Sequence, residues 1–261
     1  MLVRTEIGLQ HLILKENKNK PFNLELSIGN HFMSLITKDS NSDVIFHTRK
    51  DFDRIIETQL LTSKLNLFFE ENDLDCEIIE NVKLYQENDL FTLVPNELYD
   101  KNEKRTYLKY ITKVKKNDFI SNDNIEELKI KNVYIPYVNV NNFLVDKFKN
   151  ITYYHFNSIL IKKLFQIKDN KSFFAHIDNN KLKIIIFNKD NLIFFNSYEI
   201  QSRSDIIYYI LLCLKEKGLD VNDTLINFIN DSKNDDLFDF LNKFFNSWKI
   251  INDKKIDFLY S

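Results

Sequence analysis

The sequence is poor in glycine, proline and cysteine. The shortage of glycine excludes glycine-rich nucleotide-binding loops, and the shortage of cysteine argues against a disulfide framework. Three glycines among 261 residues leave no GxGxxG fingerprint and no Walker A loop. The two cysteines, Cys76 and Cys213, lie far apart and belong to no CxxC pair. We therefore expect them to be small apolar residues in a reducing compartment and not a disulfide. No flexible linker stands out between structured segments.

No long stretch is dominated by charge of one sign. The 36 basic and 38 acidic side chains nearly cancel, so the sequence lacks the basic surface typical of nucleic-acid binding. The first residues lack the continuous apolar region of a secretory signal. The longest strongly apolar run, Ile206 to Leu214, is too short to span a bilayer. We expect a cytoplasmic protein with no nucleic-acid partner and no direct membrane insertion.

Hydrophobic residues make up 44% of the sequence, which is enough for a substantial core. Their pattern predicts an α/β protein. Alternation of apolar and polar residues predicts an antiparallel meander of three strands, with a tight turn at Gly29-Asn30. Helical spacing of apolar residues follows, and then another strand. The predicted elements are strands at Phe22 to Ile28, His31 to Thr37 and Asp43 to Thr48, a helix from Lys50 to Glu71, and a strand from Cys76 to Tyr85.

The same order of elements returns about 150 residues later. A second meander precedes a helix that Ser204 can cap and Gly218 can end. The predicted elements are strands at Ser172 to Ile177, Lys181 to Asn188 and Leu192 to Ile200, a helix from Ser204 to Lys217, a strand from Thr224 to Asn230, and a helix from Asp235 to Phe245.

Two copies of βββαβα predict duplicated RNase-H-like units, the arrangement of the actin-like ATPase fold. Each unit would be a mixed sheet that starts with a three-stranded antiparallel meander, and the two would face one another across a crevice. The expected organisation is an N-terminal extension (1–21), a first half (22–170) and a second half (171–261). The first half is longer because of an inserted segment at about 90–149. That segment contains predicted helices at Arg105 to Val114 and Asn141 to Phe148.

Three stretches resemble an uncharacterised Bacteroidota family, the domain of unknown function DUF3822. They are Phe91 to Tyr99 (FTLVPNELY), Asn132 to Tyr137 (NVYIPY), and Phe195 to Ile200 (FNSYEI) running into Asp205 to Tyr209 (DIIYY). Their order and spacing match the family over about Phe22 to Lys249. The resemblance implies an actin-like ATPase fold, in agreement with the repeat, and it supplies no established activity.

Actin-like ATPases hold phosphate and metal with two hairpins of the form Asp-x-Gly, in which glycine admits the phosphate and aspartate orients metal-bound water. This chain has Ser27-Ile28-Gly29 in the first half and Asp178-Asn179-Asn180 in the second. One has lost the carboxylate and the other the glycine. Ser27, Gly29, Asp178 and Asn180 are thus candidate remnants of phosphate hairpins, or ordinary turn residues. At the position of the Gly-Gly turn in the adenosine pocket of this fold, the chain has Ile229-Asn230-Asp231-Ser232, whose side chains would crowd the adenosine ring.

The remaining candidates do not assemble into a catalytic or metal site. The histidines are scattered without metal-ligand spacing. His176 and Asp178 lie two residues apart on one strand and therefore share a face, but no third candidate residue accompanies them. We predict neither catalytic nor metal-binding residues. The expected function is a non-catalytic interaction or scaffold module that binds a partner protein or its own copy, with Leu90 to Lys149 as a candidate surface. The alternative is a protein that binds ATP or ADP, or a weak ATPase of the actin-like superfamily. Binding of ATP and Mg²⁺ is possible for this fold, but the motifs of this chain do not support it.

Overall fold

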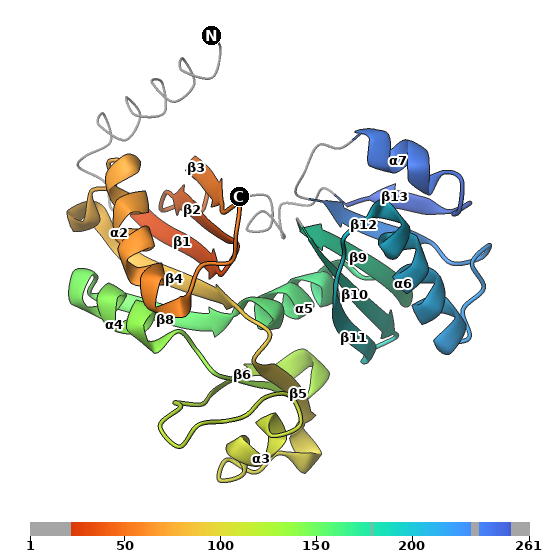
Figure 1. Ribbon diagram of the computed structural model, residues 1–261, viewed down its shortest axis with the longest axis horizontal. Helices are drawn as coiled ribbons and strands as arrows, with labels where there is room; N and C mark the ends of the chain where they lie inside the picture. The colour runs from red at the N-terminus through yellow and green to blue at the C-terminus, as the bar shows by residue number, and fades with distance from the viewer. Residues whose placement is uncertain (1–21, 179, 231–234, 252–261) are drawn as a thin grey trace. The chain divides into compact units, whose positions relative to one another are not determined.

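The structure is a computed structural model that describes residues 22–178, 180–230 and 235–251 (Figure 1). The chain forms two compact units, which divide after Leu160, within helix α5 (Phe156–Ile167). Each unit contains a five-stranded mixed sheet.

The sheet of the first unit has the strand order β3-β2-β1-β4-β8. Neighbouring strands of the initial meander are antiparallel, and β4 and β8 then add in parallel. The strands are β1 (Phe22–Gly29), β2 (Phe32–Lys38), β3 (Val44–Asp51), β4 (Ile79–Glu87) and β8 (Asn150–His155).

The sheet of the second unit repeats this topology with the order β11-β10-β9-β12-β13. It again has an antiparallel meander followed by two parallel strands. The strands are β9 (Lys171–Asp178), β10 (Lys181–Asn188), β11 (Asn191–Glu199), β12 (Ile226–Asn230) and β13 (Trp248–Ile250). The predicted duplication is confirmed, because the two meanders lie in separate sheets of identical connectivity.

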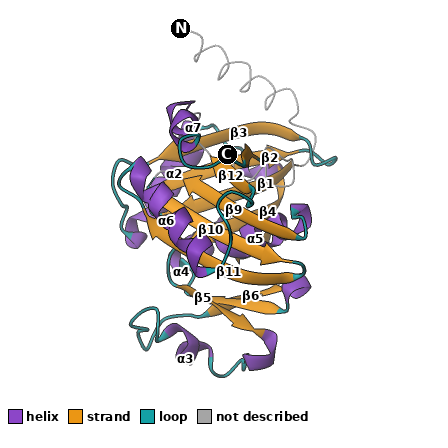
Figure 2. Ribbon diagram, turned by 90° about the vertical axis from the view of Figure 1, so that its right-hand side faces the viewer, coloured by secondary structure: helices purple, strands orange, loops and turns teal. Residues whose placement is uncertain are grey.

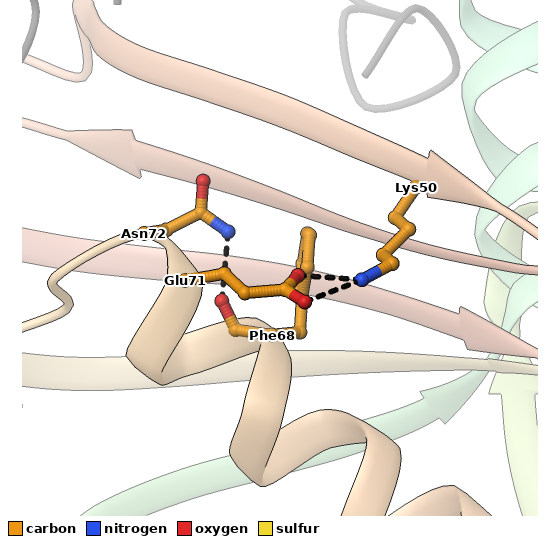
Figure 3. A network of polar contacts seen from close by, with 4 residues as sticks. All are labelled: Lys50, Phe68, Glu71 and Asn72. Atoms are coloured by element: carbon orange, nitrogen blue, oxygen red, sulfur yellow. Dashed lines mark hydrogen bonds and ion pairs between the residues drawn. The ribbon is translucent and has the colours of Figure 1, made fainter.

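Helices α2 (Leu61–Glu71) and α4 (Val138–Lys147) share the core of the first unit with one face of its sheet. Alternation along β1 sends Leu24 and Leu26 into this core, where both are fully buried. The C-terminal end of α2 is fixed by side chains (Figure 3). The Asn72 amide donates to the Phe68 carbonyl oxygen at 2.7 Å. The Lys50 ammonium lies 2.7 and 2.6 Å from the two carboxylate oxygens of Glu71, which joins the end of β3 to the helix.

The helix predicted from Lys50 begins later, and this boundary was wrong. Strand β3 continues to Asp51, and a short 3₁₀ turn (Thr58–Leu60) precedes α2. The backbone N–H groups of Phe52 and Ile56 donate to the carbonyl oxygens of His31 (2.7 Å) and Asn30 (2.9 Å). The apolar side chains still pack on the core, although their backbone is bonded to the β1–β2 turn and is not helical.

In the second unit α6 (Arg203–Glu216) covers one face of the sheet, and α7 (Asp235–Leu241) joins the same core (Figure 2). The predicted cap at Ser204 was wrong, since Ser202 occupies the N-cap position. The Asp205 carboxylate accepts the backbone N–H groups of Gln201 and Ser202, each at 2.8 Å, and so closes the first turn. Gly218 follows the helix with φ of 61°, the left-handed conformation expected of a terminating glycine.

A third sheet lies between β4 and β8 of the first unit, in the segment that was predicted to be an insertion. Its strands are β5 (Phe91–Pro95), β6 (Ser121–Ile125) and β7 (Ile130–Tyr134), in the order β5-β7-β6, with helix α3 (Lys104–Leu108) packed against them. Three short 3₁₀ turns complete the unit at Cys76–Ile78, Asn96–Leu98 and Glu126–Leu128. The predicted insertion thus contains this sheet together with α4, which has a counterpart in α7.

Helix α3 ends at Leu108, six residues before its predicted end. The reason lies in Arg105, whose guanidinium donates to three backbone carbonyl oxygens further along the chain. These belong to Lys115 (2.8 Å), Lys116 (2.9 Å) and Asp118 (2.8 Å). The segment between α3 and β6 is therefore folded back as a loop around one side chain.

Candidate functional site

The predicted hairpin remnants occupy equivalent places in the two units. Ser27 and Gly29 lie at the end of β1, before the turn into β2, and Asp178 and Asn180 lie at the turn from β9 into β10. Asn179 is outside the described residues. Each unit therefore places its candidate residues where its first strand ends, and we describe each hairpin within its own unit.

In the first hairpin, the space beside Gly29 is filled by an aromatic ring. A Cβ atom on Gly29 would lie 3.2 Å from Cε1 of Phe32. Phe32 is buried, with its ring edge-to-face with that of Phe156 at a centroid distance of 6.4 Å and below the Arg49 guanidinium at 4.2 Å. Ser27 is buried in the same sheet, between Ser34 of β2 and Tyr85 of β4. The glycine here makes room for the protein's own side chain.

The side chain of Tyr137 also anchors the turn after Gly29. The Tyr137 hydroxyl lies 2.7 Å from Oδ1 of Asn30 and 2.7 Å from the carbonyl oxygen of Glu87. Burial, together with the charges of Glu87 and Asp89, raises the pKa of Tyr137 well above its ordinary value. Glu87 is itself buried directly opposite Gly29.

In the second hairpin, Asp178 is 7% exposed and stands opposite Lys181, the first residue of β10. His176, fully buried, stands opposite Lys183, which is 1% exposed. Directly opposed residues of an antiparallel pair share a face, so the carboxylate and the imidazole each have a lysine as cross-strand neighbour. Sequence patterns did not distinguish these two lysines from the other lysines of the region. A local signal was their spacing of two residues, which places Lys181 and Lys183 on the same face of β10.

The turn expected to crowd an adenosine ring is only partly described. Ile229 is fully buried in β12 opposite His176, and Asn230 ends the strand. Asp231 and Ser232 lie outside the described residues, so the interpretation of this turn stays a prediction. Among the residues that the structure describes, no group of three or more His, Cys, Asp or Glu side chains could hold a metal ion. Within the same ranges, no helix is long and apolar enough to cross a membrane.

A buried polar junction that the sequence did not indicate joins the third sheet to the start of α5. The Asp123 carboxylate accepts the Tyr134 hydroxyl at 3.1 Å through Oδ1 and the His155 backbone N–H at 2.7 Å through Oδ2. Ser158 adds a side-chain hydrogen bond. Because α5 begins at Phe156, the carboxylate lies at the positive end of that helix.

The electrostatics of this junction are dominated by burial. Burial raises the pKa of Asp123 to about 6, although the hydrogen bonds from Ser158, His155 and Tyr134 act in the opposite direction. The His155 ring is fixed on both sides, since Nδ1 accepts the Asn157 N–H at 3.2 Å and Nε2 lies 3.1 Å from the carbonyl oxygen of Asn88. That pattern assigns the proton of a neutral imidazole to Nε2. The arrangement joins the third sheet to the start of α5.

Comparison with solved structures identifies the fold. A Bacteroides thetaiotaomicron VPI-5482 protein described as having an actin-like ATPase fold and unknown function matches with a TM-score of 0.73 and 19% identity, over 94% of this chain and 97% of that one. The PilM-PilN type IV pilus biogenesis complex matches with a TM-score of 0.54 and 9% identity, over 88% of each chain. Comparison with curated proteins found no match. The likeness to the solved structures establishes the actin-like ATPase fold.

Comparison with family models gives one match, to the family described as Protein of unknown function (DUF3822), over residues 13–247. This range includes the first five-stranded sheet, the third sheet, and the second five-stranded sheet as far as β12. It also includes the three stretches in which the sequence resembled that family. The chain therefore belongs to the DUF3822 family and has the actin-like ATPase fold.

Proposed function

We propose that this protein is a non-catalytic interaction module built on the actin-like fold, which binds a partner protein through the segment that carries the third sheet. The observation that carries the proposal is the first hairpin. There the Phe32 ring occupies the space beside Gly29, and buried Glu87 stands opposite the same glycine. The Phe32 ring works against phosphate binding at this turn, because it fills the space beside the glycine.

The segment with the third sheet has the exposure that a partner surface requires. Tyr110 is 88% exposed and Leu98 is 70% exposed, and Ile111 and Phe119 are more than half exposed. All four lie within residues 98–119, around α3. Exposed apolar and aromatic side chains that cluster in one segment are typical of protein-binding surfaces. That the PilM-PilN complex contains a chain of this fold supports a role in protein assembly.

A capture experiment tests this proposal. The tagged protein and a Leu98→Ser/Tyr110→Ser/Ile111→Ser variant would be incubated with native cytosol of the source cell, and the bound proteins identified by mass spectrometry. We expect the variant to lose a partner that the unchanged protein captures repeatedly. The matched control is Tyr208→Ser/Leu211→Ser on α6, which removes exposed apolar side chains from the second unit and should retain the partner. A partner retained by both variants, or no reproducible partner together with a strictly monomeric protein, contradicts the proposal.

A second candidate function is nucleotide binding, which the retained carboxylate at the end of β9 favours. Asp178 is held at the hairpin with Lys181 opposite it, so one acid and one base lie where this fold places a phosphate hairpin. Isothermal titration with Mg-ATP and Mg-ADP separates the two candidates. Micromolar affinity that is lost in Asp178→Ala would favour nucleotide binding at the hairpin, whereas the interaction module predicts no binding heat that depends on Asp178.

A further inference from the structure

The face of the first sheet opposite its core carries a row of polar side chains in register across four strands. Strand pairing aligns Lys38 of β2, Asn23 of β1, Asn81 of β4 and Asn150 of β8. The Asn81 amide donates to Oδ1 of Asn23 at 2.9 Å, which shows that these side chains lie side by side. The row stands at the beginning of β1, at the opposite end of that strand from Gly29.

A second polar row lies beside the first and contains an ion-pair system. Glu25 of β1 aligns with Lys83 of β4, which aligns with Thr152 of β8. The two Glu25 oxygens are shared between two lysines, with Oε2 at 3.0 Å from the Lys38 ammonium and Oε1 at 3.9 Å from that of Lys83. One carboxylate therefore holds two ammonium groups over the same part of the sheet.

These rows form the floor of a cavity of about 610 Å³. Lys149 and Ser42 also line the cavity, together with three apolar residues, Leu24, Val82 and Ile151. The volume lies within the range of roughly 300–1,000 Å³ that small-molecule sites occupy. The lining has three lysines (Lys38, Lys83, Lys149) and one glutamate (Glu25), a formal charge of 3 − 1 = +2. The whole chain carries −2, so the cavity is a local exception.

We propose that this cavity binds a small oxyanion, a molecule that bears a phosphate or carboxylate group. Ammonium groups and side-chain amide N–H groups are the donors that recognise such oxygens, and hydrogen bonds between ionised partners are the stronger ones. Lys83 and Lys149 reach solvent, with Lys83 55% exposed at the side chain. Glu25 orients Lys38 and Lys83 and would compete with the ligand for them. The proposal does not depend on the proposed partner surface.

The test is calorimetric titration of the full-length protein with inorganic phosphate and with citrate, in buffers brought to equal ionic strength with sodium chloride. We expect saturable binding of at least one anion, a tenfold or greater loss of affinity in Lys83→Gln/Lys149→Gln, and tighter binding in Glu25→Gln because the competing carboxylate is gone. The matched control is Lys64→Gln/Lys215→Gln, which removes two exposed lysines from α2 and α6 and should leave the affinity unchanged.

The two anions separate the possible ligand chemistries. Binding of phosphate alone assigns a phosphorylated ligand, and binding of citrate alone assigns a carboxylate ligand. The proposal is overturned if neither anion binds, or if the Lys83/Lys149 and Lys64/Lys215 variants weaken binding equally. Equal weakening would mean a non-specific effect of net charge. Because all four lysines are exposed, both variants should fold, which far-UV circular dichroism checks.

Discussion

Replacing Asp123 by Asn should remove a pH dependence of stability whose sign and size follow from the junction at the start of α5. Burial raises the pKa of this carboxyl from 3.8 to about 6 in the folded protein. Between these two values the folded state binds more protons than the unfolded state. The contribution of the Asp123 carboxyl to the free energy of unfolding is therefore largest below about pH 4 and falls as the pH rises through 6. A shift of about two pKa units corresponds to roughly 3 kcal/mol, at 1.36 kcal/mol per unit.

The substitution separates this charge effect from the loss of hydrogen bonds. At neutral pH, Asp123→Asn removes a buried charge. It also replaces one of the two acceptor oxygens by an NH2 group, which is a donor and cannot accept the hydrogen bond from the Tyr134 hydroxyl or the His155 N–H. A lost buried hydrogen bond costs about 1–3 kcal/mol, so the two changes nearly cancel. The informative quantity is the difference between the two proteins as a function of pH.

Urea unfolding followed by circular dichroism from pH 4 to 7.5 at constant ionic strength measures that difference. We expect the advantage of the unchanged protein over Asp123→Asn to fall by about 2–3 kcal/mol across this range. Asp146→Asn, on the exposed side of α4, is the control for the loss of an exposed acidic side chain. Carbon-detected NMR should place the titration midpoint of the Asp123 carboxyl near pH 6. A pH-independent difference, or a midpoint near 4, would refute the reasoning.

Three further outcomes are expected. Gly29→Ala should lower the free energy of urea unfolding by about 1–3 kcal/mol, because its Cβ would press on the Phe32 ring at 3.2 Å; unchanged stability would show that the ring yields freely. Asp205→Asn should lower the thermal midpoint at neutral pH. Backbone N–H donors depress the pKa of this carboxyl, so its stabilisation is lost as the pH falls below about 4 and the variant should then match the unchanged protein. Cys213, whose pKa burial raises, should react with a thiol reagent only on unfolding, whereas partly exposed Cys76 should react first; equal rates in the native state would contradict this.

The duplicated architecture could be predicted because it depends on local patterns that the structure keeps. Alternation along β9 and β10 determines which side chains enter the core, and β10 begins and ends at the predicted residues, Lys181 and Asn188. The family resemblance agreed with the same plan. The errors in helix boundaries came from interactions across the sequence. The bonds of Phe52 and Ile56 to the β1–β2 turn delay α2, and no local propensity indicates them.

The sites were less predictable than the fold, since they depend on residues brought together from distant positions. Asp123 lies in a polar run, Ser121 to Asn124, that resembles a loop, yet it forms strand β6 by pairing with β7. Its partners Tyr134 and His155 are 11 and 32 residues away. The polar rows across the first sheet likewise exist only in the registers of β1, β4 and β8. A periodicity can assign each residue to a face, but it does not assign its neighbours across strands.

The loop that Arg105 organises has a consequence for how the third sheet could change over time. One guanidinium fixes the path of the chain between α3 and β6 by binding three carbonyl oxygens, and Tyr110 and Ile111 are displayed on that path. The acceptors of Arg105 are backbone carbonyl oxygens, which every residue has, so the exposed side chains of Tyr110 and Ile111 are free to vary in size and polarity. A lineage could thus exchange one recognition surface for another without altering the buried scaffold, provided that this single arginine is kept.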